Sequence, residues 1–265
     1  MHLRLFQVDA FTSRVFAGNP AAVVPLERWL DDRTLQAIAT ENNLSETAFL
    51  VGEKGQYHIR WMTPTDEVDL CGHATLASAW VVFNEIEKGR TEAQFRSQSG
   101  PLRVSAEGPR LALDFPSRPP APHDASLPGL AEALGSRPQA ALASRDSLAV
   151  FASEEEVRAL KPDMAKVAAL DRLGVIVTAP GRDCDFVSRF FAPGVGIPED
   201  PVTGSAHCTL VPYWAKRLGK TSLFARQVSS RGGELWCADQ GERVKIAGHC
   251  VKYLEGTIEL PDTRS

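Results

Sequence analysis

The chain has 265 residues, of which 43% are hydrophobic and 23% charged, and its formal net charge is -4. This composition is typical of a globular protein and lacks the basic excess that binding to nucleic acid requires, so we expect no nucleic-acid partner. The longest apolar run, residues 74–83, is about half as long as a membrane span, so we expect no membrane partner.

Five cysteines are widely spaced and form no C-x-x-C pair, a pattern that does not favour zinc or any other metal. The first residues show no basic region followed by a long apolar one, so no secretory signal is predicted. Both observations lead us to expect a reducing, cytoplasmic environment.

In chain order, the first half is predicted to contain two strands, a helix, two strands and a second helix. Their ranges are residues 3–11 and 21–26, a helix from Asp31 or Asp32 to about Thr40, residues 45–51 and 57–62, and the segment after Gly72. That last helix is apolar on every side, which is typical of a helix surrounded by other elements. A hairpin is expected at residues 94–115.

Four prolines in residues 116–122 indicate a change of structural unit, so we predict halves of 1–116 and 117–265. A last strand near 255–265 is expected to pack back on the first half. The second half is predicted to have helices at 125–134, 154–160 and 163–170, strands at 175–178 and 185–191, a helix after Gly204, and further strands in 227–260.

An internal repeat relates the two halves. Residues 60–64 followed by 71–76 resemble residues 189–193 followed by 203–208, and the proline-to-glycine spacing is eight residues in the first copy and eleven in the second. In each copy a strand and a turn lead to a glycine that opens an apolar helix. Two helix N-termini with unpaired N–H groups would make a cleft between the halves suited to a small anion.

Glu46 is the best candidate for a general acid/base. It lies at the entrance of a predicted strand and has apolar neighbours at Leu44 and Ala48. A carboxylate in such surroundings is suited to moving protons. The matching place in the second half, near residues 172–174, has no carboxylate, so this group is present only once.

Other residues near the repeated glycines are candidates for binding and proton handling. Gly72 and Gly204 would let a ligand approach the backbone, and Ser205 would add a hydroxyl. His73 lies in the first helical turn, where the helix dipole is expected to keep its ring neutral. Asp200 precedes Gly204 and either caps the helix or binds a polar group of the ligand.

Two alternative chemistries involve Cys71. A thiol hydrolase would need Cys71 and His73 to face each other, which we do not expect for residues two apart at a helix start. A two-base racemase would need an acid and a base on opposite faces of a carbon, and the repeat-related positions are Cys71 and Thr203. Because a threonine hydroxyl is too weak an acid, the sequence favours proton transfer along one face of the substrate.

The motifs together resemble the PhzF family, which is related to diaminopimelate epimerase. They are residues 16–23 (FAGNPAAV), which include Asn19, then 44–49 (LSETAF), 71–76 (CGHATL), 199–206 (EDPVTGSA) and 230–233 (SRGG). The resemblance implies an α+β fold of two pseudo-symmetric halves, each a barrel-like, mostly antiparallel sheet around a central helix, with the active site between them.

The resemblance also implies an activity. In the family's isomerase, the glutamate matching Glu46 moves a proton between two ring carbons of trans-2,3-dihydro-3-hydroxyanthranilate, and no cofactor is used. His73 and Asp200 would contact the substrate and handle protons. The substrate would be bound by Asn19, Cys71, Gly72, Thr203, Gly204 and Ser205.

We therefore expect an isomerase acting on a small carboxylate-bearing metabolite, and the resemblance suggests a homodimer. Two alternatives stay open: an amino-acid racemase or epimerase, which would depend on Cys71, and a non-catalytic protein that binds small carboxylates, which would lack a buried Glu46.

Overall fold

The computed structural model describes residues 1–261 and divides into two compact units. Unit 1 comprises Met1–Asp114 and the residues from Ala247 onward, and unit 2 comprises Phe115–Ile246. The chain returns to unit 1 because strand β18 (Cys250–Glu259) pairs antiparallel with β1 (His2–Ala10) along its length. This return begins earlier than the predicted strand at 255–265, of which residues 262–265 lie outside the described part.

Unit 1 is a mostly antiparallel sheet. Its strands pair in the order β18, β1, β2, β3, β4, β6, β7, β8, with β5 on β4, and only β2–β3 and β4–β6 are parallel. The remaining bounds are β2 (Asn19–Leu26), β3 (Glu46–Glu53), β4 (Gln56–Met62), β5 (Glu67–Val68), β6 (Glu92–Ser97), β7 (Gly100–Glu107) and β8 (Arg110–Pro116). Helix α1 (Asp32–Asn42) is capped by the side chain of Asp31.

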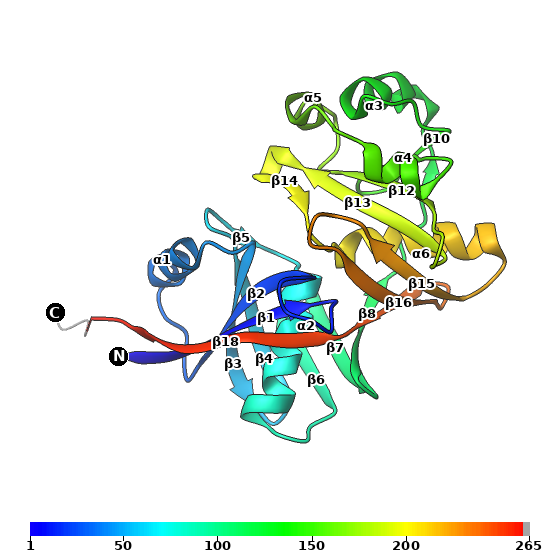
Figure 1. Cartoon of the computed structure of the whole chain (residues 1–265). Helices are drawn as coiled ribbons and strands as arrows, with labels where there is room; N and C mark the ends of the chain where they lie inside the picture. Colours follow the sequence, from blue (N-terminus) through cyan, green and yellow to red (C-terminus); the bar gives the residue numbers. More distant parts are fainter. Residues whose placement is uncertain (262–265) are drawn as a thin grey trace. The chain divides into compact units, whose positions relative to one another are not determined.

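Helix α2 (Gly72–Val81) is the centre of unit 1. It contacts β1, β2, β3, β6, β7 and β18, and the strands lie around it in Figure 1. All its residues except Trp80 are buried, as expected for a helix that is apolar on every side. The chain continues in one π-helical turn, η1 (Val82–Ile86). No helix within residues 1–261 has the length and apolar character needed to cross a membrane.

Unit 2 repeats this arrangement. Its strands pair in the order β9, β10, β11, β12, β13, β15, β16, with β14 on β13, and only β11–β12 and β13–β15 are parallel. The bounds are β9 (Ala121–Pro122), β10 (Ala140–Ala143), β11 (Ser147–Val150), β12 (Val175–Pro180), β13 (Phe186–Ala192), β14 (Ile197–Asp200), β15 (Ser222–Gln227), β16 (Gly233–Asp239) and β17 (Arg243–Gly248).

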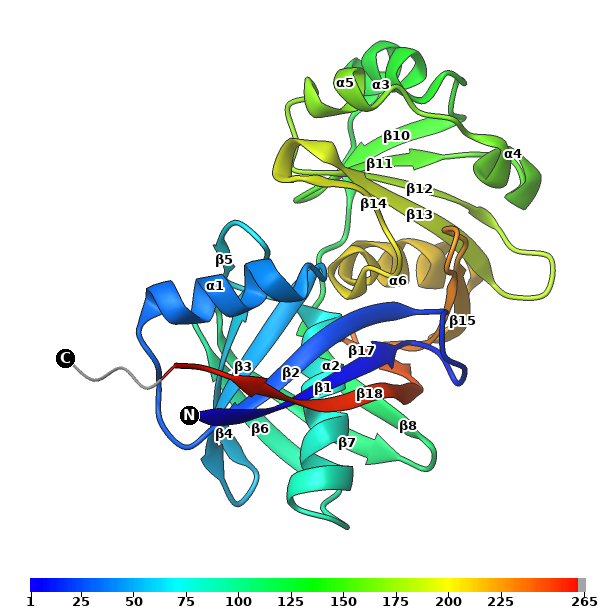
Figure 2. The same ribbon diagram turned by 60° about the vertical axis from the view of Figure 1, so that its left-hand side comes forward.

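The helices of unit 2 differ in role. Helix α6 (Gly204–Leu218) is the counterpart of α2 and packs on β15 and β16 (Figure 2). The others are α3 (Leu127–Leu134), α4 (Glu154–Ala159), α5 (Met164–Ala168) and the short turns η2 (Asp124–Ser126) and η3 (Pro193–Val195).

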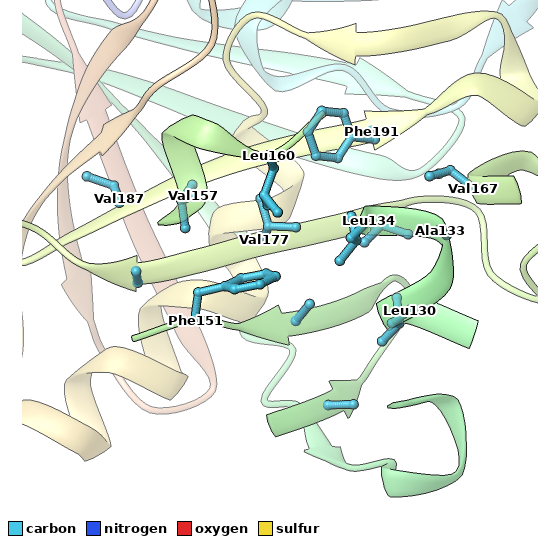
Figure 3. Close-up of a cluster of buried hydrophobic side chains, with 14 of the residues drawn as sticks. Leu130, Ala133, Leu134, Phe151, Val157, Leu160, Val167, Val177, Val187 and Phe191 are labelled. Atoms are coloured by element: carbon cyan, nitrogen blue, oxygen red, sulfur yellow. The ribbon is translucent and has the colours of Figure 1, made fainter. Parts of the chain in front are cut away.

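A second core in unit 2 lies between the sheet and helices α3, α4 and α5. Phe151 and Phe191, both at most 1% exposed, meet Leu130, Leu134 and Val157 there. Figure 3 shows these side chains converging from the strands and the helices. Burial of side chains of this size contributes roughly 1.5–3 kcal/mol each, so the cluster fixes the sheet from which α6 and its first turn are presented.

The internal repeat therefore extends to strand pairing. The parallel pairs β2–β3 and β11–β12 correspond, as do β4–β6 and β13–β15, and α2 and α6 follow the equivalent short strands β5 and β14. Trp61 lies opposite Val68 in the first copy, and Phe190 lies opposite Asp200 in the second. This register aligns Asp200 with Val68, Thr203 with Cys71 and Ser205 with His73.

Candidate active site

Glu46 and His73 form a close, buried pair in unit 1. Glu46 is the first residue of β3 and lies opposite Ala21 of β2, and His73 is the second residue of α2. The Glu46 Oε2 atom is 3.1 Å from His73 Nε2, and the two residues are 7% and 5% exposed. The two atoms are close but are not aligned for a hydrogen bond, so the contact is electrostatic. Neither atom has a hydrogen-bond partner, so each can still bind a further group.

The opposite nitrogen of the same ring is held by two other predicted site residues. Asn19 Nδ2 lies 3.2 Å from His73 Nδ1, and Cys71 Sγ lies 3.5 Å from the same atom. The starts of β2, β3 and α2 thus bring Asn19, Glu46, Cys71 and His73 together within one unit. Gly72 opens α2 between Cys71 and His73.

The expectation that Cys71 and His73 do not face each other is wrong. That expectation used helical spacing, but Cys71 is the N-cap and has an extended backbone, with φ -140° and ψ 109°. Its side chain therefore does not follow the helical rotation and turns toward the imidazole. Burial, followed by the charge of Glu46, raises the pKa of the Cys71 thiol to about 11, so the sulfur is protonated near neutral pH.

The expectation that the helix dipole keeps His73 neutral is also wrong. Burial lowers the pKa of His73, but the neighbouring Cys71 and Glu46 outweigh burial and raise the pKa well above its usual value. Since Cys71 keeps its proton near neutral pH, the carboxylate of Glu46 is the neighbouring charge that raises the pKa of His73 there. An ion pair at 3.1 Å is stronger than the partial charge of a helix end.

The side chains of Glu46, Cys71 and His73 also lie close enough to be considered as metal ligands, with ligand atoms within 4.8 Å of one another. However, Nδ1 of His73 faces the thiol whereas Nε2 faces the carboxylate. A ring placed between its neighbours cannot offer one nitrogen to a metal shared with both. The geometry fits a chain of polar groups that shares protons.

The beginning of α6 in unit 2 has a different polar arrangement. The hydroxyl of Thr203 donates to Asp200 Oδ2, and the amide of Thr203 donates to Gln227 Oε1 at 2.8 Å. Gln227 in turn donates to the carbonyl of Asp200 at 2.8 Å. Asp200 and Thr203 are thus held by Gln227, a residue that the sequence analysis missed because it belongs to no motif and ends a strand 24 residues further on.

Ser205, the counterpart of His73, contacts another residue that the sequence analysis missed. Arg145 Nη2 donates to Ser205 Oγ at 3.1 Å. Arg145 lies in the turn between β10 and β11, where no spacing pattern identifies it. The N-cap side chains Cys71 and Thr203 make no capping hydrogen bond to their helices, so the first N–H groups of α2 and α6, at Gly72 and Gly204, are suited to an anion.

Unit 2 has no carboxylate at the position equivalent to Glu46, and the reason is steric. The strand register aligns Glu46 with Gly174, which immediately precedes β12. A Cβ atom at position 174 would collide with the ring of Phe190. The second copy therefore has no room for a side chain at that place, and the predicted asymmetry is confirmed.

The fold is that of an α+β protein built from two copies of one unit. The first copy contains the buried pair of Glu46 and His73. Residues 8–256 match the family model described as "Phenazine biosynthesis-like protein", and the chain belongs to this PhzC-PhzF family. An uncharacterized isomerase of Pseudomonas aeruginosa is 56% identical over 261 residues, which are 98% of this chain and all of the relative.

Solved structures agree with this assignment. A PhzF family protein of Enterococcus faecalis superposes with a TM-score of 0.93 at 48% identity, covering 98% of this chain and 100% of that one. A hydroxyproline epimerase of Agrobacterium vitis has a TM-score of 0.65 at 10% identity, covering 99% and 94% of the two chains, and shares the fold alone. The predicted diaminopimelate epimerase-like fold class is thus confirmed.

Proposed function

We propose that this protein is an isomerase that moves a proton along one face of a small carboxylate-bearing metabolite, with Glu46 as the acid/base. The observation that carries the proposal is the buried contact between Glu46 and His73, which places a proton acceptor beside an imidazole whose pKa is raised. Relatives that match this chain over nearly its whole length are named isomerases, which supports the class of reaction.

The proposed reaction needs no net oxidation or reduction. The carboxylate of Glu46 takes a proton from a carbon atom of the substrate, and the electron pair of the broken C–H bond moves into the conjugated system. The resulting acid returns the proton to another carbon on the same face. His73 would stabilise the carboxylate form of Glu46 before the first step and after the second, while Asn19 and Cys71 orient the ring through Nδ1.

The substrate's carboxylate would be bound by helix N–H groups, at Gly72, Gly204 and Ser205, as the sequence motifs suggest. A cyclic substrate similar to trans-2,3-dihydro-3-hydroxyanthranilate and a reaction without a cofactor are parts of the proposal taken from the family resemblance. Asp200 as a proton-handling partner, both halves serving one site, a homodimer and a cytoplasmic location stay predictions.

Racemisation is a weaker candidate. Cys71 keeps its proton near neutral pH, and its counterpart Thr203 donates its hydroxyl proton to Asp200, so neither position supplies a ready base. A non-catalytic binding protein would lack a buried carboxylate, whereas Glu46 is 7% exposed and lies beside the imidazole of His73.

Solvent deuterium exchange tests the proposal. Small cyclic and amino carboxylates are incubated with the protein in heavy water, and incorporation into carbon positions is followed by NMR. We expect Glu46→Gln to lower the exchange rate by at least about a hundredfold, in line with the loss of a general acid/base. The control is Glu53→Gln, at the exposed end of the same strand, which should exchange like the wild type. Equal exchange by Glu46→Gln would show that another group moves the proton.

A further inference from the structure

Three arginines surround one buried carboxylate in unit 2. Asp146, whose side chain is 1% exposed, accepts from Arg145 Nε at 3.3 Å, and the charges of Arg118 and Arg172 also act on it. Arg172 is fixed beside them because its Nη1 donates to the carbonyl of Ser144 at 2.9 Å. We call Arg118, Arg145, Asp146 and Arg172 the arginine cluster.

The arginine cluster has more positive than negative charge. Arg172 has a second carboxylate, Asp171, 3.9 Å from its Nε and largely exposed, but within residues 1–261 no carboxylate lies in ion-pair contact with Arg118. Burial raises the pKa of Asp146, and the three arginines oppose that shift. An uncompensated guanidinium at a partly buried position favours the binding of an additional anion.

Three buried polar atoms of the arginine cluster have no hydrogen-bond partner. They are Arg118 Nη1, Asp146 Oδ1 and Arg172 Nε. Buried polar groups in folded proteins are nearly always satisfied, so three open ones in a charged cluster indicate a site completed by a ligand or ordered water.

The arginine cluster is joined to the first turn of α6. Arg145 donates to Ser205, whose hydroxyl follows the uncapped N-terminal glycine of the helix. In the repeat, the same step from the second strand to the helix is made in unit 1 by Asn19 and His73. In the register of the repeat, Arg145 aligns with Pro20, the residue next to Asn19, and 34% of its side chain is exposed.

We propose that Arg145 is a specificity-determining residue that binds a carboxylate group of the substrate at the first turn of α6, an inference that rests on the proposed function. Its planar guanidinium can pair with both oxygens of a carboxylate, while Ser205 and the helix N–H groups supply further donors. The protein would thereby select acidic ligands over neutral ones of the same shape.

Calorimetric titration with benzoate, benzamide and phenyl phosphate tests this inference. Benzoate and benzamide have the same shape and differ in charge. We expect Arg145→Gln to weaken benzoate binding by about tenfold and to leave benzamide binding unchanged. Arg145→Lys, which keeps the charge beside Asp146 but loses the planar fork, should weaken benzoate binding less, and it covers the case in which Arg145→Gln does not fold.

The matched control is Arg158→Gln, which removes a more exposed arginine of α4 that also pairs with one carboxylate, Glu154. It should bind benzoate like the wild type. Equal benzoate affinity of Arg145→Gln and Arg158→Gln would overturn the inference, and so would tighter binding of phenyl phosphate than of benzoate.

Titrations with Glu46→Gln separate this inference from the proposed reaction. That variant should bind benzoate within about threefold of the wild type, because it keeps the arginine cluster. Loss of benzoate selectivity in Arg145→Gln together with normal exchange by Glu46→Gln would refute the reaction and keep the carboxylate site. Unchanged selectivity in Arg145→Gln together with lost exchange in Glu46→Gln would refute the carboxylate site and keep the proposed reaction.

Discussion

Two buried histidines, one in each unit, have pKa values that their surroundings shift in opposite directions. His73 faces the carboxylate of Glu46, and its pKa lies well above the usual value. His207 Nδ1 lies 2.8 Å from the carbonyl oxygen of Thr203, its ring contacts Phe186, and burial lowers its pKa to about 4. Both lie in the first turns of equivalent helices, so the carboxylate, and not the helix, accounts for the difference.

These states can be observed by nitrogen NMR of the two imidazoles. We expect His73 to be protonated and His207 neutral at pH 7. In Glu46→Gln the pKa of His73 should fall below that of free histidine, because burial remains and the opposing charge is gone. His207 in the same variant is the internal control. A wild-type His73 that loses its proton below pH 6.5 would contradict the ion pair.

His73 and His207 change the pH dependence of folding stability in opposite directions. His73 binds its proton more tightly in the folded state, so its contribution is complete below about pH 6.5 and is lost as the pH rises through the folded pKa. His207 binds its proton more weakly when folded, from 6.5 to about 4. Stability therefore falls as the pH drops through that window, by about 3 kcal/mol in total.

For individual residues, the sequence motifs predicted which side chains form the site better than they predicted how those side chains are arranged. Asn19, Glu46, Cys71 and His73 were all predicted, and they meet in unit 1. The orientation of Cys71 and the charge of His73 were not predictable, because both depend on an N-cap dihedral and a contact 27 residues apart in sequence. Gln227 and Arg145 reach α6 from turns and strand ends, for which the sequence offers no spacing rule.

At the scale of elements, the two copies share an arginine–glutamate pair that joins equivalent strands. In unit 1, Arg60 of β4 donates twice to Glu67 of β5. In unit 2, Arg189 of β13 donates twice to Glu199 of β14. Arg189 also donates to the carbonyls of Val157 and Leu160 at the end of α4, so it supports a helix as well as a strand.

Because Arg189 makes these additional contacts, we expect the same substitution to lower the free energy of unfolding more at Arg189 than at Arg60. We expect Arg189→Met to lower the free energy of unfolding by about 3 kcal/mol, because it leaves a partly buried carboxylate and two carbonyls without their donor. Arg60→Met is the matched control and should cost less, about 1–2 kcal/mol, since its pair with Glu67 is more exposed and its contact with Asp32, the first residue of α1, lies at the surface. Denaturant unfolding measures both values, and a larger loss for Arg60→Met would refute this account.

Sequence patterns predicted some helices and strands and missed others. The buried helix α2 was evident from apolar residues on all sides, and the longer strands of unit 1, with β12 and β13 of unit 2, from alternation. Strands β5, β9, β10, β11 and β14 were missed because, at two to four residues, they are too short to show a period, and β15 was missed as well. The early return of β18 to unit 1 was not predicted either, because half-exposed residues along that strand mask the alternation.

At the scale of the whole molecule, a duplicated fold carries chemistry that is not duplicated. Unit 1 has Glu46 in contact with His73, whereas unit 2 has Gly174 under the ring of Phe190 and Arg145 beside Ser205. A single base implies that the proton which leaves the substrate is the proton that returns, in the proposed reaction. Two bases on opposite faces would instead deliver a different proton from solvent.

Transfer of a deuterium label within the substrate tests this claim most directly. A substrate found by the exchange screen is deuterated at the carbon that loses its proton, and early product is analysed by mass spectrometry and NMR. The account predicts that a measurable fraction of the deuterium appears at the new carbon of the same molecule. Product that carries only solvent hydrogen at that carbon, from the first turnover onward, would contradict one-faced transfer by Glu46.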